Sequence, residues 1–347
     1  MTLTIKDIAR LAGVSHTTVS QVLNHKGRIS EKKRKQVLEI CERENFVPNH
    51  LARSLQVRET KVLGIILNFF GNPFFSEIIR GIENVANQNN YVLLFGDARE
   101  LPERESMYIN TFLERRVDGI ILYPTFSPEF EKNLVKLKLQ KTPFVLVDRF
   151  SEQLKTNVVA CDDVLGGRLA TEHLVKIGHR QIGIILGPPS STMNRRLQGF
   201  RETLLRQGIS EKHACVGKFE ISRQNNVVNG YRAALELLNQ KDRPTALFVT
   251  TDEAVPGVLK AARELELSVP DGLAIVGYGN MKDIVEMDVP LTSVDYPKTE
   301  VGEEAMKLLL GLMKNDQEEK PKQLLLKPEL VIRESCGYCL KKINESK

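Results

Sequence analysis

Apolar residues recur at helical spacing in the first part of the chain. In residues 5–24 the pattern is interrupted at Ala12-Gly13-Val14 and resumes at Val19. This predicts two short amphipathic helices joined by a tight glycine-containing turn, with Ser15 as the N-cap of the second. Residues 31–45 predict a third helix. The arrangement is a helix-turn-helix whose second helix turns the polar residues between His16 and Gln21 outward, where short side chains can reach base edges in a major groove.

Residues 48–60 separate this helical module from the rest of the chain. Pro48 and Asn49 make a natural helix start, but the stretch at 49–56 is barely two turns long and is too short to be stable alone in water. We therefore expect a linker that folds on binding.

From Lys61 onward the pattern changes to alternating strands and helices. Strands are expected at 62–67, 91–95, 119–123, 144–147, 158–161, 182–186, 246–249 and 273–276. Helices are expected at 74–88, 102–115, 164–177, 195–207, 227–238 and 253–264. This alternation predicts parallel sheets covered by helices on both faces. The length favours two sheets, with a break near 160–163, and ligands bind at the carboxyl ends of such strands.

Positive charge is concentrated at the amino-terminal end. Residues 1–61 hold twelve Lys and Arg against six Asp and Glu, a net charge of +6, whereas the whole chain carries +5, so the remainder sums to −1. An ordinary helical hairpin is the alternative interpretation of the first helices. The charge favours a module that binds nucleic-acid phosphates.

The overall composition is that of a globular protein. The 347 residues are 41% apolar and 27% charged, and the amino-terminal residues have no apolar segment of the signal-peptide type. We therefore expect a cytoplasmic location. Five scattered cysteines do not form a disulfide framework. The Cys336–Cys339 pair has half the ligands of a structural zinc site, so no metal or cofactor is expected.

The chain lacks the motifs of the common enzyme classes. It has no phosphate-binding P-loop, no zinc-protease HExxH, no nucleophile elbow and no dinucleotide-binding GxGxxG after a strand. His173 and His179 belong to a predicted helix and its capping turn, where packing explains them. We therefore expect binding without catalysis.

Several motifs in order along the chain resemble those of the LacI/GalR family of bacterial transcription repressors. They are TIKDIARLAGVSHTTVSQVLN at 4–24, VPNHLARSL at 47–55, NPFFSEIIRGIE at 72–83, RRVDGIIL at 115–122, ATEHLVKIGHRQIGII at 170–185, RRLQGF at 195–200, RPTALFVTTDE at 243–253, VPDGLAIVGY at 269–278 and PELVIRES at 328–335. The resemblance covers nearly the whole chain, and the motifs together are specific where any one alone would not be.

The resemblance implies an N-terminal all-α helix-turn-helix headpiece and an α/β core of two parallel-sheet subdomains, similar to periplasmic sugar-binding proteins. The implied divisions are a headpiece at 1–47, a hinge helix and linker at 48–60, a core at 61–340 and a tail at 341–347. Within the core, the N-subdomain is expected at about 61–160 and 292–322, and the C-subdomain at about 162–289 and 323–340.

The resemblance also assigns DNA-contacting positions. Family base-reading positions fall on His16, Thr17 and Gln21, and Leu55 matches a hinge leucine that wedges into the minor groove. Many members carry arginine at the position of Gln21, so a preference for adenine over guanine is expected there. The full set expected at DNA is Thr4, Ser15, His16, Thr17, Thr18, Ser20, Gln21, Asn24, Asn49, Ala52, Arg53 and Leu55.

For a small-molecule effector, family positions in the cleft between the subdomains fall on Asn72, Phe74, Phe75, Asp148, Arg196, Thr251 and Gly279. Core packing is the alternative interpretation for one of the two phenylalanines. Gly279 departs from the family, because sugar- and nucleoside-binding members usually carry an aspartate there. Thr251 stands where asparagine is frequent, and Asn280 is a possible substitute for the missing carboxylate.

The function implied is a homodimeric regulator, expected to be a repressor, whose affinity for a near-palindromic DNA operator is controlled by an effector, expected to be a sugar or sugar derivative. One alternative is a catabolite-control regulator whose core binds a phosphorylated partner protein. A more remote alternative is a solute-binding α/β protein. No membrane partner is expected. Because only twelve residues follow Ser335, too few for three heptads, a dimer is expected and not a tetramer.

Overall fold

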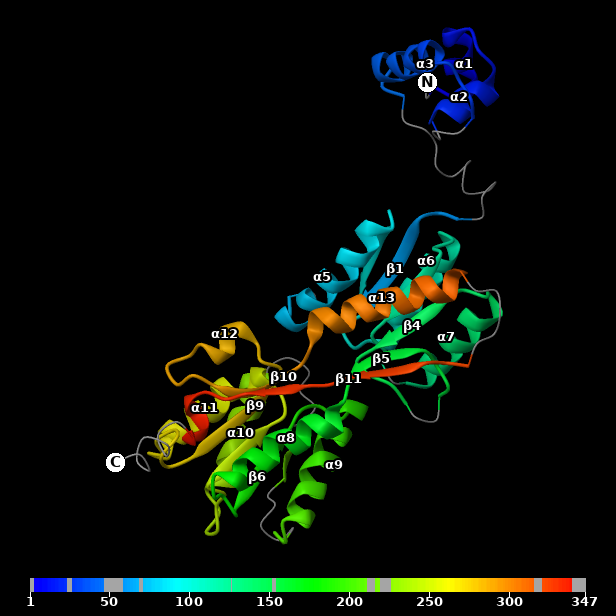
Figure 1. The fold of residues 1–347 in the computed structure, drawn as a ribbon. Coiled ribbons are helices and arrows are strands. Elements are labelled where there is room, and N and C mark those ends of the chain that lie inside the picture. Colours follow the sequence, from blue (N-terminus) through cyan, green and yellow to red (C-terminus); the bar gives the residue numbers. More distant parts are fainter. Residues whose placement is uncertain are drawn as a thin grey trace. The chain divides into compact units, whose positions relative to one another are not determined.

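The computed structural model describes residues 3–23, 27–46, 59–68, 71–125, 127–151, 154–210, 216–218, 226–314 and 320–338. The chain divides into two compact units, Met1–Thr60 and Lys61–Lys347. Figure 1 labels the helices and strands of both units.

The described part of the first unit contains three helices, α1 (Ile5–Ala12), α2 (His16–Leu23) and α3 (Glu31–Arg43). Gly13 ends α1 in the left-handed conformation with φ 60°, which glycine adopts without steric cost and which makes the tight turn into α2. Buried residues from all three helices form one small core: Ile8, Ala9, Ala12, Val19, Val22, Val37, Ile40 and Cys41. Leu11 and Leu38 contribute less to this core, since they are 48% and 41% exposed.

The second unit contains two six-stranded sheets. The sheet of the N-lobe has the order β11-β5-β4-β3-β1-β2 and is parallel at every pairing. Its strands are β1 (Val62–Leu67), β2 (Val92–Asp97), β3 (Gly119–Leu122), β4 (Phe144–Val147), β5 (Val158–Cys161) and β11 (Gln323–Leu326). Helices α5 (Pro73–Gln88) and α13 (Lys298–Lys314) pack on one face, and α6 (Pro102–Glu114) and α7 (Pro128–Leu139) pack on the other.

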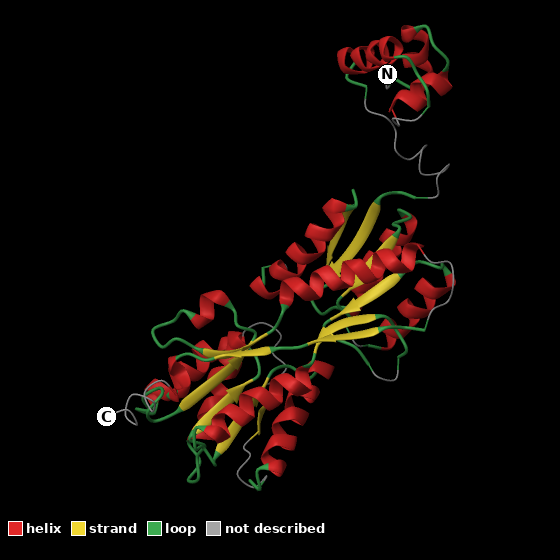
Figure 2. Cartoon of the chain, viewed as in Figure 1, coloured by secondary structure: helices red, strands yellow, loops and turns green. Residues whose placement is uncertain are grey.

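The sheet of the C-lobe has the order β12-β10-β9-β8-β6-β7, with only the β10–β12 pair antiparallel among the described strands. Its strands are β6 (Ile182–Leu186), β7 (Val216–Lys218), β8 (Ala246–Val249), β9 (Ala274–Tyr278), β10 (Thr292–Asp295) and β12 (Glu329–Val331). Helices α8 (Asp163–Lys176) and α9 (Ser191–Arg206) cover one face, and α10 (Asn226–Leu238) and α11 (Val255–Glu264) cover the other. Figure 2 shows the strands of both lobes between their helices. Three short helices, η2 (Asp252–Ala254), α12 (Lys282–Val285) and η3 (Glu334–Cys336), complete this lobe.

The chain passes between the lobes three times: after β5, between β10 and α13, and between β11 and β12. The predicted subdomain ranges are wrong at two of these passages. Strand β10, expected in the N-subdomain, pairs with β9 of the C-lobe. Strand β11, expected in the C-subdomain, pairs in parallel with β5 and extends the sheet of the N-lobe.

The predicted fold class, a helical headpiece followed by an α/β core with two parallel-sheet lobes, is confirmed by this topology. One buried apolar cluster runs through both lobes, from Leu63 and Ile121 to Ile184 and Phe248. Across the described ranges, no helix has both the length and the apolar character needed to span a bilayer.

Candidate nucleic-acid interface and interlobe site

Helix α2 presents the predicted base-reading side chains to solvent. Its core positions Val19 and Val22 are fully buried, whereas His16, Thr17 and Gln21 are exposed. The Ser15 hydroxyl accepts a hydrogen bond of 3.1 Å from the backbone N–H of Thr18, so the expected N-cap is present. The start of this helix is therefore ordered, with three polar side chains free to contact base edges.

Thr4, Thr18 and Ser20 of the predicted DNA set have intramolecular contacts. The Thr4 hydroxyl donates a 2.6 Å hydrogen bond to Asp7, and the Asp7 carboxylate also accepts from the backbone N–H of Thr4 at 3.0 Å, as part of a capping box at the start of α1. The Thr18 hydroxyl lies 2.9 Å from that of Ser15. Thr18 and Ser20 are half-buried. Asn24, Asn49, Ala52, Arg53 and Leu55, which include the predicted hinge, lie outside the described residues.

In the second unit, Arg196 and Asp163 form a buried ion pair. Gly167 of α8 lies so close to α9 that a β-carbon there would be 2.2 Å from the Arg196 carbonyl oxygen, so the helices pack backbone to backbone at this point. Arg196 Nε donates to Asp163 Oδ1 at 2.7 Å, and Nη1 donates to the Thr250 carbonyl at 2.7 Å. Its guanidinium lies 3.6 Å from the centre of the Tyr278 ring. Burial would lower the pKa of Arg196, but neighbouring Asp163 holds it above its ordinary value.

Asp148 follows β4 of the N-lobe and is close to this pair. It is 4% exposed and adopts φ 65°, an uncommon conformation for a residue other than glycine. The pKa of Asp148 is raised to about 6, mainly by burial and secondly by the negative charge of Asp163 in the C-lobe. Its Oδ1 atom has no hydrogen-bond partner. We call Asp148, Asp163, Arg196, Tyr278 and Tyr296 the interlobe junction.

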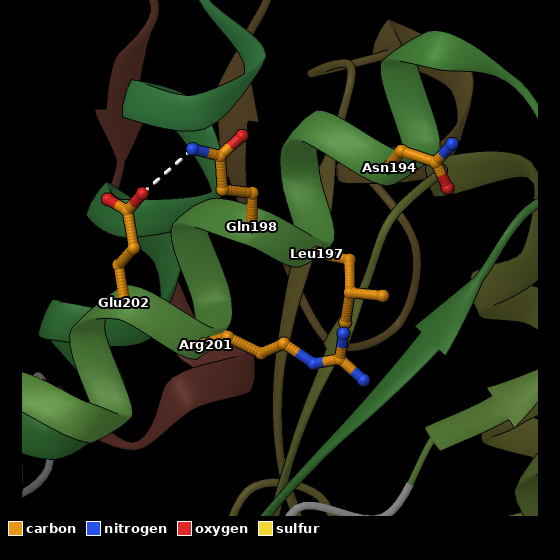
Figure 3. Close-up of a pocket in the computed structure, with 5 residues that line it drawn as sticks. All are labelled: Asn194, Leu197, Gln198, Arg201 and Glu202. Atoms are coloured by element: carbon orange, nitrogen blue, oxygen red, sulfur yellow. Dashed lines mark hydrogen bonds between the residues drawn. The ribbon is translucent and has the colours of Figure 1, made fainter.

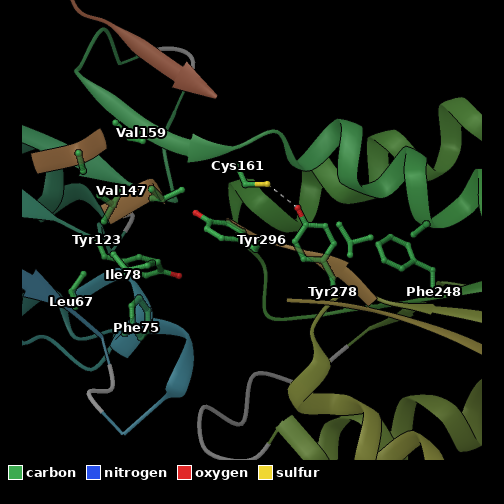
Figure 4. Close-up of a cluster of buried hydrophobic side chains, with 14 of the residues drawn as sticks. Leu67, Phe75, Ile78, Tyr123, Val147, Val159, Cys161, Phe248, Tyr278 and Tyr296 are labelled. Atoms are coloured by element: carbon green, nitrogen blue, oxygen red, sulfur yellow. Dashed lines mark hydrogen bonds between the residues drawn. The ribbon is translucent and has the colours of Figure 1, made fainter. Parts of the chain in front are cut away.

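Aromatic rings line the N-lobe side of the interlobe junction. Figure 4 shows Phe75 and Tyr123 in the N-lobe, Tyr278 beside Phe248 in the C-lobe, and Tyr296 between them. Phe75 is 4% exposed and lies edge-on to Tyr123, with 4.9 Å between the ring centroids. It is therefore a core residue, as expected for one of the two phenylalanines. Phe74 is half-buried and meets Tyr296 edge-on at 5.0 Å. The Tyr296 hydroxyl faces Asp148 without a hydrogen bond of ordinary geometry.

The other predicted effector positions are Asn72, Thr251 and Gly279. Asn72 caps α5 by accepting from the N–H of Phe74 at 2.9 Å, and its side chain lies near Glu253 of the C-lobe. Thr251 is half-buried beside η2 without a side-chain cap bond. Gly279 adopts φ 126°, and its carbonyl accepts a 2.6 Å bond from Lys298 Nζ.

Asn280, the possible substitute for the missing carboxylate, has its side-chain oxygen occupied within the protein. Its side-chain oxygen accepts a 2.9 Å hydrogen bond from Arg333, and its backbone N–H donates to Ser293. Nearby Asp252 is fully buried, accepting from Ser293 and the N–H of Met281. These hydrogen bonds, all made by groups of the protein itself, hold the turn at residues 279–281 in place.

Four residues of this region were absent from the predicted effector set: Arg149, Asp163, Tyr278 and Tyr296. Tyr278 donates a 2.8 Å hydrogen bond to Asp163 Oδ1, the same oxygen that Arg196 holds. Arg149 pairs with Glu100 at 2.9 Å and lies over the Tyr123 ring. Arg149 and Tyr278 could have been predicted from the sequence, because they are adjacent to the predicted effector residues Asp148 and Gly279.

A surface hollow of about 340 Å³ lies elsewhere, along α9. Figure 3 shows its lining: Asn194, Leu197, Gln198, Arg201 and Glu202. All five belong to one helix face, and a 2.8 Å hydrogen bond joins Gln198 to Glu202. Because none of them is a junction residue and none has a buried unpartnered atom, this hollow lacks the features of a specific ligand site.

Cys336 of the CxxC pair is buried, and Cys339 lies outside the described residues. Its Sγ atom is 3.2 Å from His173 Nε2 and also accepts a hydrogen bond from the Thr292 hydroxyl. Burial lowers the pKa of His173 to about 4, so the imidazole is neutral near pH 7. These contacts anchor η3 to α8 and β10.

A helix-turn-helix headpiece followed by a two-lobed α/β core defines the class of DNA-binding transcription regulators with a periplasmic-binding-protein-like core. Residues 4–49 match the model of bacterial regulatory proteins, lacI family, and residues 171–336 match that of a periplasmic binding protein-like domain. The chain belongs to the LacI family. It is 35% identical to the ribose operon repressor of Haemophilus influenzae, with 97% of this chain and 99% of that protein covered.

Solved structures agree with this assignment. The lac repressor dimer bound to operator and an anti-inducer superposes with a TM-score of 0.85 at 27% identity, covering 97% of this chain and 99% of the other. A LacI-family regulator from Enterococcus faecium with bound ribose gives a TM-score of 0.69 at 27% identity, covering 79% of this chain and 98% of the other.

Proposed function

We propose that the chain is a homodimeric repressor whose affinity for a near-palindromic operator is controlled by a sugar or sugar derivative bound at the interlobe junction. The observation that carries the effector site is Asp148, a buried carboxylate with an unpartnered oxygen where the lobes meet. Burying a charged group without a partner costs free energy, which a bound ligand would recover. Such perturbed groups are concentrated at functional sites.

The contacts of the headpiece support sequence-specific DNA binding. His16, Thr17 and Gln21 are exposed at the start of an ordered helix, and the first 61 residues carry the excess positive charge of the chain. The charge supplies salt-dependent attraction to phosphates, while the three side chains select bases.

The relatives support a sugar as effector and a dimer as the active form. One relative is named a ribose operon repressor, and one solved family structure holds ribose. The lac repressor structure is a dimer on its operator. The edge strand β2 leaves Val92 61% and Phe95 42% exposed. We expect a second copy of the chain to cover these apolar side chains.

The proposed mechanism is a two-state change in the relative angle of the lobes. An effector that binds one arrangement more tightly shifts the population towards it. The hydrogen bond from Lys298 to the Gly279 carbonyl joins the lobes and would be remade in such a change. In a dimer, this alters the spacing of the two headpieces and thereby the operator affinity.

The test begins with operator selection from random DNA by the purified full chain, followed by footprinting. We expect a near-palindrome with half-sites about one helical turn apart, and protection of a single asymmetric half-site would contradict the dimer. Fluorescence anisotropy on that operator is then measured with a panel of sugars, sugar phosphates and nucleosides.

Phe74→Ala is the informative variant for the effector site, because Phe74 is half-buried against Tyr296 and makes no polar contact with its side chain. It should lose the effector response and keep operator affinity. Leu205→Ala, at a position 79% exposed on α9, is the control and should keep both. An unchanged effector response in Phe74→Ala would place the site elsewhere.

A further inference from the structure

His173 and Cys336 meet inside the C-lobe, although 163 residues separate them along the chain. His173 lies on α8 and is 7% exposed, and Cys336 ends η3 and is 1% exposed. The Nε2 atom of the imidazole is 3.2 Å from the Sγ atom of the thiol. Imidazole nitrogen and thiolate sulfur are the ligand atoms of structural Zn²⁺ sites. The fold therefore adds a histidine to the Cys336–Cys339 pair, which the spacing along the sequence does not reveal.

The separation of these two atoms is close to that in a zinc site. With a Zn–S bond of about 2.3 Å, a Zn–N bond of about 2.0–2.1 Å and tetrahedral angles, the two ligand atoms lie about 3.6 Å apart. The distance from His173 Nε2 to Cys336 Sγ is only a few tenths of an ångström shorter than this. A small rotation of either side chain therefore reaches the zinc geometry.

The chain after Cys336 continues beside the imidazole. Gly337 is in the left-handed conformation with φ 74°, which turns the chain at the end of η3. The centroid of the Tyr338 ring is then 5.5 Å from that of the His173 ring. Cys339 lies outside the described residues and enters here through covalent geometry alone, because its Cα atom is about 3.8 Å from that of Tyr338. A second thiol thus follows directly after a residue that contacts His173, at the C-x-x-C spacing of zinc ligands.

This set of ligands favours a thiophilic cation. Two thiolates neutralise the charge of Zn²⁺, so the occupied site has no net charge, and burying it costs less than burying a bare ion. Thiolate and imidazole suit Zn²⁺, whereas Ca²⁺ and Mg²⁺ take oxygen ligands. The Thr292 hydroxyl lies 3.2 Å from Cys336 Sγ and can donate to a thiolate there. Such outer hydrogen bonds orient the ligands of a metal and tune its affinity.

We propose that His173, Cys336 and Cys339 bind one Zn²⁺ ion, with water at the fourth position. The bound ion joins η3 and the residue that follows Tyr338 to α8. Each thiol releases its proton to solvent as the ion binds, so the apparent affinity rises with pH. None of the three ligands belongs to the interlobe junction, so the zinc site does not depend on the proposed effector.

The experiment is a metal titration of the purified full chain, reduced with a phosphine and freed of metal by EDTA that is then removed. Co²⁺ is added first, because tetrahedral Co²⁺ bound to thiolates absorbs visible light, and Zn²⁺ is then added to displace it. We expect one equivalent of Co²⁺ to produce the tetrahedral spectrum and one equivalent of Zn²⁺ to abolish it. A chain that does not produce this spectrum overturns the proposal.

Cys339→Ser and His173→Gln identify the ligands. Each should weaken Zn²⁺ binding by about 100-fold or more, because changing a residue that only orients a ligand already costs about 10–100-fold. Cys215→Ser and His179→Gln are the matched controls, which remove a thiol and an imidazole outside the proposed set and should leave the affinity unchanged. Circular dichroism of the metal-free chains checks folding, and if His173→Gln does not fold, Cys339→Ser decides. Wild-type affinity in either folded variant contradicts the proposal.

The competing role for the cysteine pair is a disulfide, and alkylation followed by mass spectrometry distinguishes the two. We expect Cys339 to resist alkylation while Zn²⁺ is bound and to react once EDTA has removed the ion. Equal reaction rates with and without Zn²⁺ would exclude Cys339 as a ligand. If EDTA leaves Cys339 unreactive and only a reductant frees it, the pair forms a disulfide and the zinc proposal is wrong.

Discussion

Lys298, the first residue of α13 in the N-lobe, donates a 2.6 Å hydrogen bond from Nζ to the carbonyl oxygen of Gly279 in the C-lobe. The lysine is 4% exposed, and its nearest carboxylates are at 3.7 Å and 4.0 Å, on Asp295 and Glu77. One buried ammonium group therefore joins the two lobes at the turn where this chain carries glycine in place of the aspartate frequent in sugar-binding members.

Lys298→Met should destabilise the core. Methionine fills a similar volume but leaves the Gly279 carbonyl without this donor, and an unsatisfied buried polar group costs about 1–3 kcal/mol. Urea unfolding of the full chain measures the loss in the core transition. Lys314→Met, at the exposed end of the same helix, is the control and should change the unfolding free energy by less than about 0.5 kcal/mol. Equal values for the two variants would show that the interlobe bond contributes nothing.

Most of the core fold was predictable because buried parallel strands are continuous apolar runs. Strands β1, β4 and β5 begin and end at the predicted residues. Strand β10 escaped prediction because its buried residues include Thr292 and Ser293, whose hydroxyls bond to Arg333 and Asp252. A polar residue satisfied by a distant partner has no signature in local hydrophobicity, so the second passage between the lobes was misplaced.

The same limit applies to the interlobe junction. Asp148 and Arg196 were predicted as effector residues and lie near each other. Their partners were not, because Asp163 is 33 residues from Arg196 and 115 from Tyr278 along the chain. The hydrophobic pattern predicts charged residues at strand ends. Only the folded chain shows which carboxylate oxygens accept hydrogen bonds and which have no partner.

Gly167→Ala should displace α9 and with it Arg196. A β-carbon at Gly167 would lie 2.2 Å from the Arg196 carbonyl oxygen, so the helices must separate, at a cost of about 1–3 kcal/mol. We expect a lower unfolding free energy and weaker effector binding in calorimetry. Gly311→Ala is the matched control, since nothing lies within 4 Å of a β-carbon there and alanine is the better helix former. That variant should gain about 0.5–1 kcal/mol, and a loss of similar size in both would refute the packing argument.

Asp148→Asn should change how stability depends on pH. In the folded protein the pKa of Asp148 rises from 3.8 to about 6, so between these values the folded state binds more protons than the unfolded state. The unfolding free energy therefore falls as pH rises from about 4 to about 6, by about 3 kcal/mol for a shift of this size.

Asparagine does not titrate, so the variant should lose this part of the slope. It should retain the part due to Asp252, whose pKa burial also raises to about 6. Urea unfolding at several pH values measures both slopes. The same slope in wild type and variant would mean that Asp148 is not the titrating group.

Gln21→Arg should change which base the headpiece selects. Gln21 is exposed on α2, and its amide can bond adenine bidentately, whereas arginine prefers guanine. Selection from random DNA should therefore replace adenine by guanine at one position of each half-site, with a discrimination of about 1–3 kcal/mol. Lys35→Gln, which removes an exposed positive charge of α3, is the control, because losing attraction to phosphates should weaken binding to all sequences alike. An unchanged consensus for Gln21→Arg would remove this residue from base readout.

Val92→Arg should weaken the proposed dimer. Val92 is 61% exposed on β2, the edge strand of the N-lobe sheet, and a buried unpaired arginine at a subunit interface costs several kcal/mol. We expect light scattering to show monomer at concentrations where the wild type is a dimer. The operator footprint should shrink to weak half-site protection, because two linked headpieces bind with an effective concentration that one lacks.

Leu139→Arg provides the comparison, since Leu139 is 77% exposed at the end of α7, on the opposite face of that sheet from α5 and α13. The two variants add the same charge to a similarly exposed aliphatic position, so solubility and general electrostatics change alike. If only Val92→Arg dissociates the protein, the β2 edge lies in the interface. If Leu139→Arg dissociates it and Val92→Arg does not, the second copy binds the α7 side, and the β2 edge must be covered by something else or remain in solvent.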